Sequence, residues 1–109
     1  MYRMKDKVSR LPELGRFGEP ATLVLLSLVS GPKHGYALMM HIEEEMAFRL
    51  GPGTLYGAIA KLLKYGMIRR LASDDRAKPY EITDLGRAAA SEFIRMWAPV
   101  IRIGQAGLA

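Results

Sequence analysis

The amino-acid sequence predicts a mainly α-helical domain that carries one small β-hairpin. Three observations support this fold class. Apolar residues recur at helical spacing in several segments, the pattern changes to alternation between residues 67 and 83, and glycine or proline separates most segments. A chain of 109 residues, half of them apolar, is long enough for one compact domain with one core.

The first predicted helix covers residues 20–30 and should be deeply buried. Pro20 suits the first turn of a helix, and the run ATLVLLSLVS that follows is apolar nearly all round. Gly31 and Pro32 then end the helix.

The segment before this helix, residues 1–18, is basic, and we interpret it as an N-terminal arm. Together with the apolar run it superficially resembles a signal peptide. However, Glu13, Glu19 and Pro20 interrupt the approach, and no clear small-residue cleavage site follows. The apolar run is also far too short to span a bilayer. We therefore expect a cytoplasmic protein with no membrane partner.

The second and third helices are predicted from residue 35 and from residue 54 onward. A turn at Gly51-Pro52-Gly53 separates them, as in a helix-turn-helix. Gly66 ends the third helix at the position after its C-cap.

The third helix is amphipathic. Its apolar residues fall at i, i+4, i+7 and i+8 and form one face: Leu55, Ile59, Leu62 and Leu63. The opposite face carries Thr54, Gly57, Lys61 and Lys64, with Tyr56 on the flank and Ala58 as a second small outward residue. The whole stretch 49–70 contains no aspartate or glutamate.

Two short strands and a last helix complete the domain. Residues 67–73 and 78–83 alternate in character, and the sequence DDRA between them reads as a tight turn. Thr83 can cap the last helix. Because proline lacks a backbone N–H, Pro99 should kink or end that helix. We therefore divide residues 84–109 into a helix and a tail.

This order of elements is that of a winged helix-turn-helix over residues 19–83. In such a fold the third helix enters the major groove of DNA, where phosphates would repel an acidic side chain. The hairpin, or wing, adds four cations: Arg69, Arg70, Arg76 and Lys78. The excess of 16 Lys and Arg over 11 Asp and Glu also suits an acidic partner. The alternatives are a solvated basic surface, or a winged helix that binds protein or RNA.

Enzymatic chemistry finds no support in the sequence. The chain has no cysteine, which excludes disulfides, thiolate metal sites and cysteine nucleophiles. No serine stands in a motif with a histidine, and no glycine-rich phosphate loop is present. His41 and Glu45 have a spacing that can bind a metal, but no third ligand accompanies them. We predict no catalytic site, no cofactor and no metal.

Three stretches, GPKHGYALMMHIEEE, GPGTLYGAIAKLLKYGMIRR and KPYEITDLGR, resemble the PadR family of bacterial transcriptional regulators over about residues 20–90. The resemblance implies a repressor that binds a palindromic double-stranded DNA operator as a homodimer. It makes the third helix the recognition helix and implies that the DNA contacts include Tyr36, Thr54, Tyr56, Gly57, Lys61 and Lys64. Family members often have proline where this chain has Gly57.

The length of the chain resembles the short type of the family, which has a single C-terminal dimerisation helix. That helix, here 84–109, is implied to pack with the first helix of the other subunit. Some short members place an aromatic residue there that stacks on flat drugs, and Trp97 lies at a similar position. The resemblance thus implies a small aromatic or hydrophobic effector bound by Trp97, Met96 and Phe93. The alternative is that these three residues form the core of the dimer.

Overall fold

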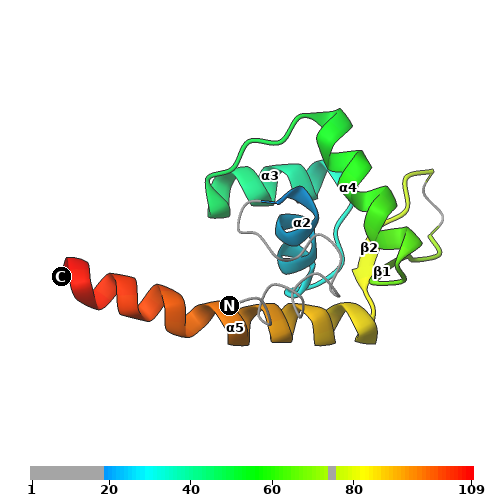
Figure 1. Cartoon of the computed structure of the whole chain (residues 1–109). Helices are drawn as coiled ribbons and strands as arrows, with labels where there is room; N and C mark the ends of the chain where they lie inside the picture. Colours follow the sequence, from blue (N-terminus) through cyan, green and yellow to red (C-terminus); the bar gives the residue numbers. More distant parts are fainter. Residues whose placement is uncertain (1–18, 74–75) are drawn as a thin grey trace.

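The computed structural model describes residues 19–73 and 76–109 and confirms the winged helix fold class (Figure 1). In chain order, its elements are α2 (Pro20–Leu28), α3 (Gly35–Met46), α4 (Pro52–Lys64), β1 (Ile68–Arg70), β2 (Tyr80–Ile82) and α5 (Asp84–Leu108). The basic arm expected over residues 1–18 and the turn residues Asp74 and Asp75 lie outside the described residues.

Helix α2 is the centre of the core. Val24, Leu25 and Leu28 are completely buried, as the nearly continuous apolar run predicts. The helix contacts α3, α4, α5 and β2, and Figure 1 shows it enclosed between α3 and α4 on one side and α5 on the other. Pro20 is its first residue, as predicted.

The wing is an antiparallel hairpin in which Ile68 pairs with Ile82 and Arg70 with Tyr80. Lys33 extends this sheet, since its N–H donates to Tyr80 O at 3.1 Å and its carbonyl accepts from Tyr80 N at 2.9 Å. Both strands are shorter than the predicted 67–73 and 78–83. One further backbone bond follows at each end of the ladder, from Leu71 N–H to Pro79 O at 2.8 Å and from Thr83 N–H to Met67 O at 3.0 Å. Pro79 has no N–H to return the second bond of its pair.

The connection between α3 and α4 differs from the prediction. Gly51 is the N-cap of α4 and Pro52 its first residue, so Gly51-Pro52-Gly53 begins the helix instead of forming the turn. Residues 47–51 make the connection. It starts at Ala47, whose backbone is left-handed with φ of 60°.

The left-handed backbone of Ala47 should make the folded protein less stable than it would be with glycine at this position. A left-handed backbone costs an L-residue about 1 kcal/mol, whereas glycine adopts it freely. We expect Ala47→Gly to raise the free energy of unfolding by up to about 1 kcal/mol in urea titrations. Ala60→Gly, in the middle of α4, is the matched control and should lower it by a similar amount. Equal losses in the two variants would contradict the assignment of strain to Ala47.

Helix α5 continues past Pro99 to Leu108, so the predicted tail is helical apart from Ala109. The prediction that Pro99 could end the helix is wrong, because the proline lies on an exposed part of the helix where water can bond the carbonyl that it leaves unsatisfied. Figure 1 shows the second half of α5 bending away from the first half and projecting beyond the rest of the domain.

Candidate nucleic-acid interface

The two faces of α4 lie largely where the sequence places them. Leu55, Ile59 and Leu62 are buried, whereas the predicted contact residues Thr54, Tyr56, Gly57, Lys61 and Lys64 are all exposed. Ala58 is a correction: it is only 6% exposed and belongs to the core. It lies one turn from both Leu55 and Leu62, so its methyl group points to the buried side.

An open groove of about 270 Å³ runs between the start of α2 and the exposed face of α4. Thr54, Gly57 and Lys61 line one side of it, and Glu19 and Pro20 line the other. Sequence reasoning missed Glu19, because this acidic residue lies 30 positions before the acid-free stretch 49–70 and only the packing of α2 brings it near α4.

Tyr56 of α4 packs against Gly35, the first residue of α3 and the residue before Tyr36. A Cβ atom added to Gly35 would lie 2.8 Å from Cζ of Tyr56, so the missing side chain of Gly35 makes room for the Tyr56 ring. The next residue, Tyr36, is 69% exposed, and Tyr56 is 48% exposed. Both predicted contact residues therefore keep much of their surface in solvent, and Tyr56 packs against the start of the helix that carries Tyr36.

Gly57 faces open space. No atom lies within 4 Å of a Cβ built on it, so packing within the chain does not require glycine there. Glycine inside a helix costs about 1 kcal/mol relative to alanine. The described fold gives no stabilising reason for this residue.

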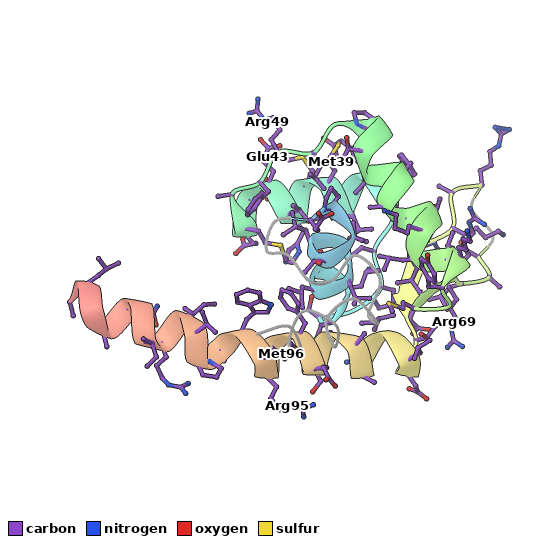
Figure 2. All side chains as sticks on the ribbon, viewed as in Figure 1. Met39, Glu43, Arg49, Arg69, Arg95 and Met96 are labelled. Atoms are coloured by element: carbon purple, nitrogen blue, oxygen red, sulfur yellow. The ribbon has the colours of Figure 1, made fainter. Side chains whose placement is uncertain are left out.

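The wing cations occupy different surroundings. Arg69 (labelled in Figure 2) pairs across the hairpin with Glu81, donating to its Oε1 at 2.8 and 3.0 Å. The Arg70 guanidinium lies 5.8 Å from the centre of the Tyr80 ring, and Lys78 Nζ donates to Ser73 O at 2.8 Å. Arg76 is exposed in the loop between the strands. An exposed ion pair such as Arg69–Glu81 contributes at most about 1 kcal/mol, so it leaves Arg69 able to exchange partners.

A polar group at the end of α2 involves Ser27, Lys33 and His41. Lys33 Nζ donates to Ser27 O at 2.6 Å and to Ser30 Oγ at 2.9 Å, and His41 Nδ1 lies 2.6 Å from Ser27 Oγ. Burial lowers the pKa of Lys33 below its ordinary value. His41 therefore bonds with a serine. Over residues 19–73 and 76–109, no three metal-ligating side chains come together, and no helix is long and apolar enough to cross a membrane.

The residues expected to bind an effector lie at the junction of α5 with the core. Phe93 is buried within the domain, and its ring centre is 6.3 Å from that of Trp97, which packs against the core and is half-buried. Met96 is also half-buried (labelled in Figure 2). Trp97 and Met96 thus keep accessible surface, whereas the side chain of Phe93 is used in packing.

Comparisons with known proteins agree with this geometry. Residues 24–92 match the model of the Transcriptional regulator PadR-like family. A 37.1 kDa protein of transposon TN4556 from Streptomyces fradiae is 43% identical over 72 residues, covering 66% of this chain and 21% of that protein. The chain therefore spans about a fifth of that relative's length.

Two solved structures share the fold. A PadR family transcription regulator from hypervirulent Clostridium difficile R20291 has a TM-score of 0.73 and 21% identity, covering 84% of this chain and 100% of that one. A transcriptional regulator from Clostridium thermocellum has a TM-score of 0.69 and 24% identity, covering 82% and 89%. Since the family model spans more than half of the sequence, the chain belongs to the PadR-like family of transcriptional regulators.

Proposed function

We propose that this regulator is a repressor that binds a palindromic DNA operator as a homodimer, with α4 in the major groove and the wing beside it. The observation that carries the proposal is the exposed face of α4, on which Thr54, Gly57, Lys61 and Lys64 lie and no acidic residue occurs. A major groove about 12 Å wide admits one α-helix. Small side chains in the middle of the face permit close approach, and the lysines then meet phosphates.

The apolar face of α5 supports the homodimer. Gly86, Ala90 and Phe93 lie on the face of α5 that packs against the core. Val100, Ile101 and Leu108 continue this face by helical spacing, yet they are 49%, 44% and 90% exposed because the body of the domain ends before them. A second α5 helix would cover this face, and two copies would then present two α4 helices to successive major grooves.

Gel shifts at increasing salt, with the DNA upstream of the chain's own gene, test the proposal. The double variant Lys61→Ala, Lys64→Ala should bind every sequence more weakly, and the slope of log affinity against log salt should fall by about two, or about one per lysine. Arg95→Ala with Arg102→Ala is the matched control, since it removes two exposed cations from α5 instead. Its salt slope should stay close to that of the unmodified protein.

Other outcomes would contradict the proposal. Equal affinity for any duplex would exclude a sequence-specific repressor, and preference for RNA over duplex DNA would favour the alternative winged helix function. An unchanged salt slope in the Lys61, Lys64 variant would show that α4 is not part of the DNA interface.

Gly57 gives a prediction with opposite effects on stability and binding. Gly57→Ala should raise the free energy of unfolding by about 1 kcal/mol, because helix propensity improves and the added methyl group meets open space. The same methyl group should weaken operator binding, because it would separate α4 from the groove. Thermal unfolding and gel shifts on one preparation measure both effects. A stabilised variant with unchanged operator affinity would show that DNA does not approach Gly57 closely.

We also propose that a flat aromatic ligand binds at Trp97 and Met96, between the subunits, and lowers operator affinity. It can do so only by binding two arrangements of the dimer unequally. Trp97 is the one tryptophan of the chain, so its fluorescence reports binding directly. We expect planar hydrophobic dyes to quench or shift this emission and to weaken the gel shift. If such dyes leave both signals unchanged, the ligand proposal is wrong.

A further inference from the structure

His34 occupies the N-cap of α3 without capping it. Its backbone is extended and its carbonyl accepts Leu38 N–H at 2.9 Å, as an N-cap carbonyl should, but its side chain makes no capping hydrogen bond. Serine, threonine, aspartate and asparagine are the residues that stabilise this position. Stability of α3 therefore does not explain a histidine here.

The imidazole of His34 instead contacts the wing. Its Nε2 lies 3.1 Å from the carbonyl oxygen of Ala77, a residue 43 positions further along the chain. Ala77 stands between Arg76 and Lys78, the two cations of the loop between β1 and β2. A hydrogen bond to this carbonyl thus holds the backbone from which both cations extend.

This contact adds to another link between the segment before α3 and the wing. The pairing of Lys33 with Tyr80 fixes the end of the hairpin next to the loop, and the bond from His34 reaches into the loop itself. On its other side, His34 is followed by Gly35, against which Tyr56 of α4 packs. A short chain of contacts therefore runs from the loop through His34 and Gly35 to the exposed face of α4.

We infer that His34 is a positioning residue that fixes the wing loop relative to α4, so that Arg76 and Lys78 reach the same DNA duplex as the recognition helix. This inference rests on the proposed DNA-binding function. His34 itself need not touch DNA, because its effect passes through the carbonyl of Ala77. Without the bond, the loop would have to be ordered at the moment of binding, and affinity would fall.

Two replacements of His34 test the inference, because one removes the hydrogen bond to Ala77 and the other keeps a donor for it. His34→Ser supplies a better N-cap but is too short to reach Ala77, so the protein should be at least as stable while operator affinity falls about fivefold, the effect of one hydrogen bond. His34→Gln keeps an N–H donor on a long side chain and should recover most of that affinity. A merely structural role would lower thermal stability and affinity together.

A double-mutant cycle locates the effect. In the background Arg76→Ala, Lys78→Ala, the His34→Ser replacement should cause no further loss of operator affinity, because the cations that it positions are absent. The same fivefold loss in both backgrounds, or no loss in either, would overturn the inference.

Limited trypsin digestion provides a readout that does not depend on DNA. Trypsin can cleave after Arg76, whereas Pro79 blocks cleavage after Lys78. His34→Ser should therefore speed cleavage after Arg76 several-fold, and cleavage after Arg102 on α5 should keep its rate. If loop cleavage does not change, His34 does not hold the loop, and the inference is wrong even if DNA binding is intact. The two proposals can fail separately. If the unmodified protein does not bind its upstream DNA but loop cleavage is faster in the variant, the proposed function is wrong and the role of His34 in holding the loop is supported.

Discussion

Gly86→Ala is expected to destabilise the protein by about 3 kcal/mol or more, which would lower the melting temperature by about 15 °C for a domain of this size. A Cβ atom at this position would collide with the carbonyl oxygen of Met67 and would lie 2.7 Å from Cγ1 of Ile82. The Met67 carbonyl cannot move aside easily, because it accepts the N–H of Thr83 at 3.0 Å. The start of α5 and the start of β1 would have to separate.

Circular dichroism during heating measures this effect, and Gly57→Ala is the matched control. Both variants place a methyl group inside a helix, but the control faces open space and should melt at a higher temperature. If Gly86→Ala does not fold, its absence from the soluble fraction beside a normally expressed control agrees with the prediction. A melting temperature equal to that of the unmodified protein would contradict it.

If the protein is the homodimer proposed above, Val100→Glu with Ile101→Glu should convert it into a monomer and reduce operator affinity by at least about 100-fold. A dimer that binds two half-sites at once has an overall affinity about 10² to 10⁴ times higher than one subunit has for one half-site. A monomer loses this factor. Burying two carboxylates against an apolar partner helix would cost more free energy than the helix contact contributes. Because both residues lie outside the core of the single chain, each variant chain should still fold.

Sedimentation equilibrium measures the oligomeric state, and gel shifts on the same samples measure affinity. Arg102→Glu serves as the control, since it introduces the same acidic residue on the polar side of α5 and should remain dimeric. A variant that stays dimeric would show that α5 is not the interface. A monomeric unmodified protein that binds its operator tightly would contradict the homodimer itself.

Much of the fold could be predicted because local patterns determine it. The apolar run of α2, the amphipathic spacing of α4, Gly66 after α4 and Thr83 before α5 are all signals contained within a few consecutive residues. Thr83 caps α5 as predicted, since its Oγ1 accepts Gly86 N–H at 3.1 Å. The family motifs around Gly35 and Gly86 were visible in the sequence, but the reason for each glycine became clear only from the Tyr56 ring and the Met67 carbonyl.

What escaped prediction depends on contacts between distant segments. The pairing of Arg69 with Glu81 requires the strand register, and the bond from His34 to Ala77 requires the wing to fold back on α3. Ala58 is different, because its spacing from Leu55 and Leu62 already places it on the buried side of α4. For Pro99 the sequence left two outcomes open, a kink or an end of the helix, and α5 bends and continues.

The single residue between the wing and the last helix has a mechanical consequence. β2 ends at Ile82 and α5 begins at Asp84, so only Thr83 separates them, and Thr83 Oγ1 also donates to Gly66 O at 2.7 Å. The part of α5 before Pro99 therefore follows the wing directly and acts as a lever attached to it. At 1.5 Å per residue this part, Asp84 to Ala98, is about 22 Å long, and a rotation of about 5° at its far end would displace the wing by about 2 Å. In the proposed dimer, small adjustments where the two copies meet would therefore be amplified at the wing.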